Sequence, residues 1–203
     1  MSNEANQGTE AWLYDRAGFI TGSRISAIFP GEDQLTSRKY LCKLAVERLT
    51  GVPLVGGFTS ERLQQGLQLE PEARDYYSML KDVDVVESGF ITHPIIPYFG
   101  TSPDGLVGHD GLLELKNRDV HIHLGLLQKR KPPRAALLQM YAQMSVSDRQ
   151  WCDYGSYNDA LPAKLRFIVI RVERNDKEIE ILENQVMRFS QEVDELTEEL
   201  RNL

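Results

Sequence analysis

Residues 98–116 read YFGTSPDGLVGHDGLLELK, and this stretch decides which folds and chemistries are open to the chain. Its two ends, Tyr98–Ser102 and Leu112–Lys116, are short β-type runs, with turn sequences rich in Pro, Asp and Gly between them. Residues two apart on a strand point to the same face, so Glu114 and Lys116 share one side of the second run. Asp104, at the preceding bend, can reach Glu114 across the hairpin. The stretch therefore predicts two carboxylates and a lysine gathered at one place.

This pattern is rare within the chain. Of nine prolines only Pro103 is followed by Asp, and of eight lysines only Lys116 has an acid two residues before it. An acid-x-Lys triplet alone occurs about once by chance in a chain of this length, and such a chance triplet is expected on a solvated edge strand. Its place ten residues after Asp104 favours a functional site instead.

Two carboxylates with a backbone carbonyl are a hard-oxygen donor set that suits Mg²⁺ or Mn²⁺. Such a cation lowers the pKa of a bound water and neutralises charge on a phosphate oxygen. A lysine beside it can orient the attacking water and stabilise the charge of the transition state. These residues are sufficient for cleaving a phosphodiester.

Outward from this stretch, the chain predicts helices around a mixed sheet, an α/β (α+β) fold. The predicted helices are Ala11–Ala17, a helix capped by Thr21 or Ser23 and ended by Pro30, one from Thr36 to Gly51, residues 59–81 with Gly66 and Pro71 loosening it, and Arg134–Val146. The further predicted strands are Val83–Val86, Phe90–His93, Trp151–Tyr157 and Leu165–Val172. His121 and His123 are expected to share a strand face on the surface or near bound nucleic acid.

The C-terminal segment Lys177–Leu203 predicts a long amphipathic helix. Its apolar residues step by four and three with an acidic outer face: Leu182, Val186, Phe189, Val193, Leu196, Leu200 and Leu203. Such a helix docks on its own domain or serves as a contact for a subunit or partner, and both readings stay open. We expect a disordered segment at 1–9, a catalytic domain at 10–176 and this helix at 177–203.

The composition is that of a folded globular protein. The 203 residues are 41% hydrophobic and 26% charged, with a net charge of −7. Residues from Glu173 onward carry ten acids and four bases, so most of the acidity belongs to the terminal helix. The stretch Glu114–Arg134 holds six bases against two acids, which makes nucleic acid an acceptable partner. No apolar run could span a membrane, no signal peptide is recognisable, and no Walker loop for ATP is present.

With these residues in view, the sequence resembles the PD-(D/E)xK nucleases, which have a restriction-endonuclease-like core. Within them it is similar to the group of the phage lambda exonuclease and the YqaJ-type viral recombinases. The motifs that carry the resemblance run in family order from about residue 12 to 172: Trp12-x-x-x-Arg16-x-Gly18-x-Ile20-Thr21-x-Ser23, Glu70-x-x-Ala73-Arg74, Ser102-Pro103-Asp104-Gly105-Leu106, Glu114-Leu115-Lys116, and QMYAQMSV from Gln139 to Val146.

The resemblance implies roles for individual residues. Asp104, Glu114 and the Leu115 carbonyl would bind the metal, with Lys116 as catalytic lysine and Glu70 as a further carboxylate. Gln139 and Gln143 lie on one helical face, and either could position the water or the phosphate; Gln139 is the preferred candidate. Arg16, Ser23 and Ser102 would bind a 5′-phosphate, since a guanidinium and hydroxyls are suitable donors. Lys129, Arg130 and Lys131 would suit the DNA backbone.

The function so implied is a 5′→3′ exonuclease on linear double-stranded DNA. It would release mononucleotides and leave a 3′ single strand for recombination by single-strand annealing. The family implies Mg²⁺ or Mn²⁺, with two ions per site, a homotrimeric ring around DNA, a single-strand annealing partner and a bacterial cytoplasm hosting a phage or prophage. Two rival functions are a nicking or restriction-type endonuclease of the same superfamily and a non-catalytic DNA-binding scaffold.

Overall fold

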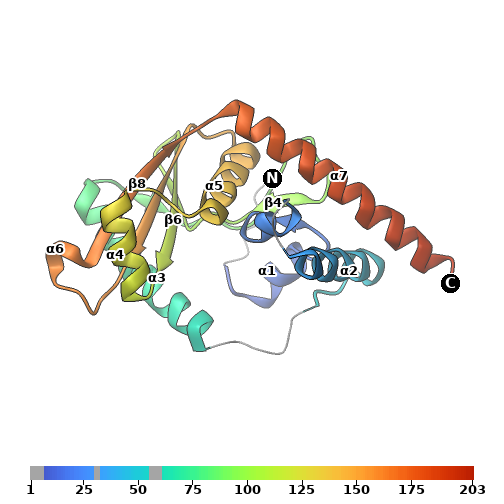
Figure 1. Cartoon of the computed structure of the whole chain (residues 1–203), viewed down its shortest axis with the longest axis horizontal. Coiled ribbons are helices and arrows are strands. Elements are labelled where there is room, and N and C mark those ends of the chain that lie inside the picture. The colour runs from blue at the N-terminus through green and yellow to red at the C-terminus, as the bar shows by residue number, and fades with distance from the viewer. Residues whose placement is uncertain (1–6, 30–32, 55–60) are drawn as a thin grey trace.

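A five-stranded mixed sheet forms one half of the protein, on the left in Figure 1. The computed structural model describes residues 7–29, 33–54 and 61–203, for 61–69 the backbone only. The strand order is β2 (Val85–Val86), β5 (Gly105–Val107), β6 (Gly111–Asn117), β7 (Trp151–Tyr157) and β8 (Phe167–Glu173). Strands β6 and β7 run parallel, and the other neighbours run antiparallel. The mixed sheet confirms the predicted fold class.

A second, smaller sheet brings the N-terminal segment to the same region. In it β4 (Phe99–Thr101) lies between β1 (Ile20–Thr21) and β3 (Ile91–Thr92). Strands β1 and β4 pair in parallel, with Ile20 opposite Phe99. This pairing brings the residues around 16–23 close to those around 98–102.

Helices surround both sheets. They are α1 (Glu10–Asp15), the 3-10 helix η1 (Gly22–Ile28), α2 (Gln34–Thr50), α3 (Glu61–Lys81), α4 (Val120–Lys129), α5 (Arg134–Ser147), α6 (Ala163–Arg166) and α7 (Asp176–Arg201). Helix α2 ends as predicted at Gly51, which adopts the left-handed conformation with φ +68°. Its N-cap is Asp33, and the predicted cap Thr36 instead donates its hydroxyl to the Asp33 carboxylate at 3.3 Å. Helix α3 continues through Pro71.

Four elements, β1, β5, α4 and α6, were not predicted from the sequence, and α6 includes Leu165, where the last strand was expected to begin. Strand β5 occupies residues 105–107, which the pattern assigned to a turn; it is short and contains a glycine that Val85 of β2 approaches closely. Residues 120–129 form α4, so the placement of His121 and His123 on a strand face was wrong. The helix repeat buries His123 and Leu126, three residues apart, and leaves His121 exposed.

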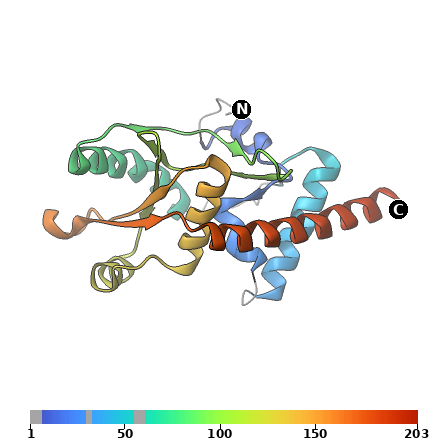
Figure 2. The same ribbon diagram turned by 90° about the horizontal axis from the view of Figure 1, so that it is seen from above.

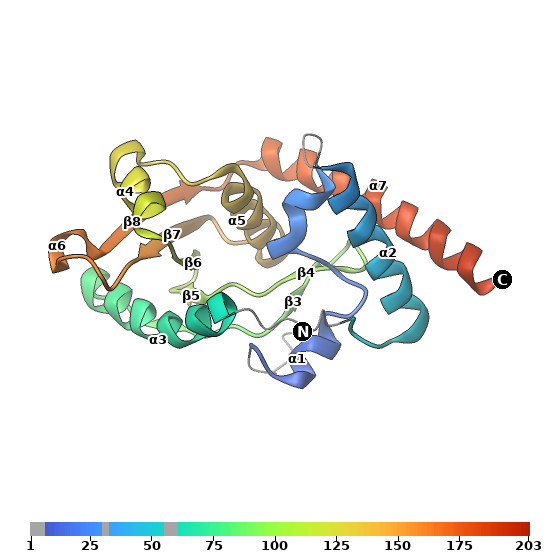
Figure 3. The ribbon, with the colours of Figure 1, turned by 60° about the horizontal axis from the view of Figure 1, so that its bottom comes forward.

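The alternation of β6 divides the large sheet into two faces, as predicted. Leu113 and Leu115 pack with Tyr77 of α3, whereas Leu112 packs with Met140 of α5. Figure 2 shows α3 and α4 on opposite sides of the sheet, and Figure 3 shows α3 and α5 separated by the strands. Because Glu114 lies between Leu113 and Leu115, its side chain faces α5.

Helix α7 lies along the outside of α2 and its last turns extend beyond the body of the molecule (Figure 1). Most of its predicted apolar seam is buried against the chain itself, with Leu182, Val186, Phe189 and Val193 in one core cluster with α2. Phe189 stacks on Tyr40 of α2 at 5.8 Å between ring centroids. Of the two readings of this segment, the structure therefore favours a helix docked on its own domain.

Residues 1–6 lie outside the described residues, while Gln7 donates hydrogen bonds to the carbonyls of Ser88 (3.1 Å) and Pro103 (2.8 Å). Among the helices that the structure describes, none has both the length and the hydropathy to cross a membrane.

Candidate active site

The two predicted carboxylates and the lysine come together where β5 meets β6. The β5–β6 register pairs Gly105 with Leu113, which places Asp104 opposite Glu114. Asp104 Oδ2 accepts a hydrogen bond of 2.6 Å from the Leu115 backbone N–H, and the Lys116 ammonium donates to Glu114 Oε1. Glu114 is fully buried and Asp104 is 9% exposed, whereas the Lys116 side chain is 28% exposed. One cation thus lies at the edge of two buried acids.

The charges of this cluster perturb each other strongly. Burial raises the pKa of Asp104 well above its ordinary value, the neighbouring Glu114 and Glu70 carboxylates raise it further, and Lys116 only partly offsets them. For Lys116, burial acts to lower the pKa, but the Glu114 and Asp104 carboxylates outweigh it, so the net shift is upward. Lys116 therefore stays an ammonium at neutral pH, and the acids lack a full complement of positive charge.

Glu70 reaches this cluster from α3, and Arg74 holds it there. Arg74 Nη2 donates to Glu70 Oε1 at 2.8 Å, Arg74 Nε donates to the Asp104 carbonyl at 3.1 Å, and Arg74 also pairs with Glu87. Burial raises the pKa of Glu70, and the Glu114 carboxylate raises it further, while Lys116 acts to lower it. Arg74 was present in the quoted helix motif without a role. Its position four residues after Glu70 was the signal for this ion pair.

The glutamine at the site is Gln143. Its amide donates a hydrogen bond of 2.5 Å to Glu114 Oε2, and its carbonyl accepts from the Cys152 thiol at 3.6 Å. Gln143 is fully buried, while Gln139, one turn earlier, is half-buried. The rotation of α5 against the sheet thus turns Gln143 toward Glu114, and the role of Gln139 in positioning the water or the phosphate stays a prediction.

The donors fit the predicted divalent cation. Two carboxylates and a backbone carbonyl at Leu115 are hard oxygen ligands, and their uncompensated negative charge would be relieved by a metal ion. Among residues 7–29, 33–54 and 61–203 no group of three or more His, Cys, Asp or Glu side chains could hold a metal. The predicted metal site does not require three such side chains, since its third protein ligand is the Leu115 backbone carbonyl.

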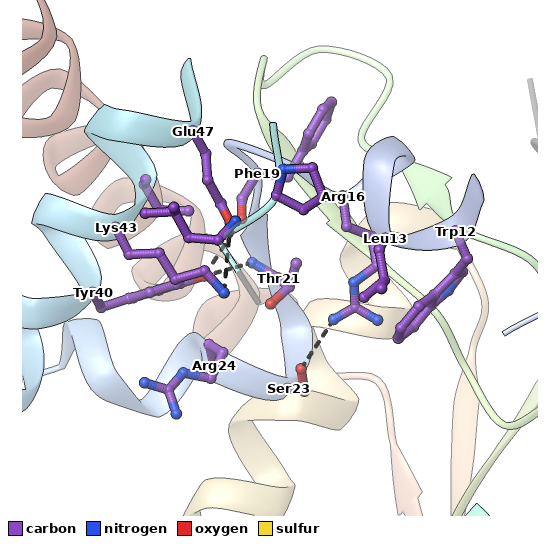
Figure 4. A pocket seen from close by; sticks show the side chains of 13 residues that line it. Trp12, Leu13, Arg16, Phe19, Thr21, Ser23, Arg24, Tyr40, Lys43 and Glu47 are labelled. Carbon is purple, nitrogen blue, oxygen red and sulfur yellow. Dashed lines mark hydrogen bonds and ion pairs between the residues drawn. The ribbon is translucent and has the colours of Figure 1, made fainter. Parts of the chain in front are cut away.

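A second site lies beside the first, in a cavity of about 280 Å³ lined by Arg16 and Ser23 (Figure 4). Arg16 Nη2 donates to Ser23 Oγ at 3.4 Å, and the guanidinium stacks over the Trp12 ring at 3.8 Å. Trp12 Nε1 in turn donates to Ser102 Oγ at 3.0 Å. Of the three residues predicted to bind a phosphate, Arg16 and Ser23 line the cavity, and Ser102 is linked to them through Trp12. The β1–β4 pairing brings them together from distant parts of the sequence.

Arg16 is a cation available for an anion. Burial lowers its pKa to about 10, so it remains charged at neutral pH. Within the part of the chain that the structure describes, no carboxylate forms an ion pair with it. Arg24 and Lys43 line the same cavity as further cations, and the Glu47 carboxylate, 3.6 Å from the Lys43 ammonium, lines it as an acid (Figure 4); sequence reasoning had not singled them out.

The family model of the YqaJ-like viral recombinase domain matches residues 11–150. The chain belongs to the YqaJ-like viral recombinase family. This assignment confirms the resemblance seen in the sequence.

Solved structures agree with the YqaJ-like assignment. An alkaline exonuclease from Laribacter hongkongensis is 36% identical with a TM-score of 0.88, covering 96% of this chain and 97% of that one. The same exonuclease in complex with dAMP gives 36% identity, equal coverage and a TM-score of 0.89. A phage-related exonuclease from Haemophilus somnus 129PT shares the fold at 14% identity and a TM-score of 0.71, covering 90% of this chain and 96% of that one. No curated protein matches the sequence.

The YqaJ-like chain thus has the restriction-endonuclease-like fold, and its family and relatives indicate a nuclease. Its remaining predicted residues lie at the surface. Lys129, Arg130 and Lys131 are exposed where α4 ends, with Arg130 in the left-handed conformation at φ +51°.

Histidine 123 has a structural role in α4. Its Nε2 lies 2.7 Å from the Leu165 carbonyl and its Nδ1 lies 2.9 Å from Ser156 Oγ. Because a carbonyl only accepts, Nε2 carries the proton and Nδ1 accepts from Ser156. His123 therefore fixes α4 to strand β7 through Ser156. Because its side chain is buried, the expectation that it lies at the surface was wrong.

Proposed function

We propose that this protein is a metal-dependent exonuclease that degrades the 5′-ended strand of linear double-stranded DNA. It would release mononucleotides and leave a 3′ single strand for annealing. The observation that supports it best is the short link between the two sites: Ser102 accepts a hydrogen bond from Trp12, which lines the cavity with Arg16, and Asp104, two residues later, belongs to the carboxylate cluster. Two extended residues span at most about 7 Å, on the order of one nucleotide step. A 5′-phosphate held in the pocket would present the next phosphodiester to the acids.

The residues of the chain divide the chemistry between them. Asp104, Glu114 and the Leu115 carbonyl would hold Mg²⁺ or Mn²⁺, two ions in the active complex. The metal supplies an acidified water and neutralises charge on the scissile phosphate. Lys116, charged and partly exposed, would orient the attacking water and donate to the phosphate oxygen that gains charge. Gln143 keeps the Glu114 carboxylate in place through its amide.

The binding pocket selects the end of the strand. A phosphate ester between Arg16 and the hydroxyls of Ser23 and Ser102 would gain a charged donor and two neutral ones. The pocket would therefore favour 5′-phosphorylated ends over hydroxyl ends, which supports digestion from the 5′ side.

The assembly and partner belong to the same proposal. A ring of three copies would enclose the duplex and keep the enzyme on it without ATP, because a closed cyclic arrangement leaves no open edge. The 3′ strand would pass to a single-strand annealing protein. The support for both is membership of the viral recombinase family.

A gel assay separates this activity from its rivals. The protein is incubated with 5′-phosphorylated linear, nicked circular and relaxed closed-circular duplex, each with Mg²⁺ and with EDTA. We expect digestion of the linear duplex with Mg²⁺, none with EDTA, and survival of the closed circle. Rapid cutting of the closed circle would instead indicate an endonuclease, and binding without cleavage would indicate a scaffold.

A further inference from the structure

The turn that presents Arg16 to the phosphate pocket depends on one glycine. Arg16 caps the end of α1, and the Phe19 N–H donates back to its carbonyl at 3.1 Å. Between them Gly18 adopts φ +77°, a conformation that residues with a Cβ rarely adopt. Because Gly18 lies two residues from Arg16, the placement of its backbone governs where the guanidinium points.

Two adjacent side chains of α2 bind both polar groups of that glycine. The Gly18 N–H donates to Glu47 Oε2 at 3.0 Å, and the Gly18 carbonyl accepts from Arg48 Nε at 2.9 Å. The side chains of Glu47 and Arg48 are 4% and 3% exposed. A Cβ on Gly18 would lie 2.8 Å from Arg48 Cγ, so the turn and the arginine fit closely. Burying charges is costly, and here two of them are used to hold one turn.

Arg48 extends this contact to the C-terminal helix. Its Nη1 donates to the Ser190 carbonyl at 3.2 Å and to Asp194 Oδ1 at 2.8 Å, and its Nη2 donates to Ser190 Oγ at 3.1 Å. The planar guanidinium thus bonds with one edge to the Gly18 turn and with its other nitrogens to α7. A guanidinium presents its donors in a rigid fork, so movement of α7 is passed to the turn.

We propose that Arg48 is a positioning residue for the phosphate pocket. Anchored on Ser190 and Asp194, it holds the Gly18 turn so that Arg16 meets the terminal phosphate. This inference rests on the proposed function, because it concerns the same pocket. It gives α7 a part in substrate selection, although the described lining of the cavity contains no residue of α7.

The test measures kcat and KM on two linear duplexes that differ only in a 5′-phosphate or a 5′-hydroxyl. Arg48→Met should raise KM for the phosphorylated duplex by about tenfold, with kcat and the hydroxyl duplex little changed. Asp194→Ala should act in the same direction by less, because it removes only the anchor on α7. Glu192→Ala is the matched control, since it removes the same charge from an exposed position of the same helix.

A double substitution shows whether Arg48 acts through Arg16. Arg16→Ala combined with Arg48→Met should lower the preference for phosphorylated ends no further than Arg16→Ala alone. Additive losses, or equal losses on both duplexes, would overturn the proposal. If Arg48→Met does not fold, Asp194→Ala decides the question, because Asp194 is 61% exposed and its removal leaves the core intact.

The outcomes also separate this inference from the function beneath it. A wild-type protein that does not prefer phosphorylated ends refutes the phosphate pocket itself. A wild-type protein that has the preference, with an Arg48→Met variant that keeps it in full, refutes only the role of Arg48.

Discussion

Replacing Gln143 by methionine tests how the buried Glu114 carboxylate is held in place. The Gln143 amide donates to Glu114 Oε2 at 2.5 Å, while Lys116 donates to the other oxygen of the same carboxylate. Methionine has a similar length and no donor, so Gln143→Met leaves one oxygen of a fully buried carboxylate without its partner. The packing of α5 against the sheet stays filled.

The size of the effect follows from these contacts. A hydrogen bond to a charged group contributes about 1.5–3 kcal/mol, and removing its donor leaves a desolvated acceptor. Since Lys116 still neutralises the carboxylate, we expect a loss in the lower part of this range, about 2 kcal/mol. If that loss falls on the transition state, the rate drops by about 30-fold.

The assay follows nucleotide release from a 5′-phosphorylated linear duplex over a range of Mg²⁺ concentrations, with thermal unfolding measured in parallel. The control is Gln139→Met, a change on the same face of α5 one turn earlier, which should keep activity within about twofold of wild type. A Gln143→Met variant as active as wild type, or a Gln139→Met variant that loses as much, would refute the assignment of Gln143.

Three further predictions concern other parts of the molecule. Asp104→Asn should abolish cleavage. It should also raise the melting temperature of the metal-free protein, because it removes the repulsion between Asp104 and the carboxylates of Glu114 and Glu70. A lower melting temperature would contradict this repulsion. Burial lowers the pKa of His93 from its ordinary value of 6.5, although Glu183 acts to raise it, and His93 Nδ1 accepts hydrogen bonds from two backbone N–H groups. As the pH falls, the histidine of the unfolded chain is therefore protonated before that of the folded protein. The free energy of unfolding should then decrease as the pH drops below about 6.5. In His93→Gln this pH dependence of the melting temperature should be weaker, and an unchanged dependence would exclude His93 as its source. Replacing Lys129, Arg130 and Lys131 by glutamine should reduce the slope of log affinity against log salt for duplex DNA by up to about three, and an unchanged slope would place the DNA elsewhere.

The carboxylate–lysine cluster was predictable because the signals that define it are local. Strand alternation places Glu114 and Lys116 on one face, and a short connection returns the chain from Asp104 to the same point. Both rules act over a dozen residues or fewer, and the structure follows them. Strand β5 escaped prediction because three residues with a glycine give too short a pattern to distinguish from a turn.

The partners that complete the cluster were not predictable in the same way. Gln139 and Gln143 lie on one face of α5, and their spacing is equally suited to the site. The rotation of that helix against the sheet brings the Gln143 amide onto the Glu114 carboxylate. Arg74 binds the carbonyl of Asp104, thirty positions away in the chain, and no local rule connects the two.

The proposed phosphate pocket depends on pairing between distant strands. Arg16 and Ser23 are close in sequence, but Ser102 joins them only because β1 lies parallel to β4. Parallel pairing joins segments far apart along the chain, so the residues indicate the site only through their resemblance to a family.

The amino-acid sequence was enough to predict the kind of fold, the two acids and lysine of the cluster, and an acidic terminal helix with an apolar seam. These properties follow from alternation, helical spacing and charge, which are set by neighbouring residues. Only the tertiary structure shows which glutamine faces Glu114 and how Arg48 joins α7 to the Gly18 turn. It also shows that the apolar seam of α7 faces its own domain. These arrangements depend on how helices rotate and pack against the sheets, and that is decided by all their contacts together.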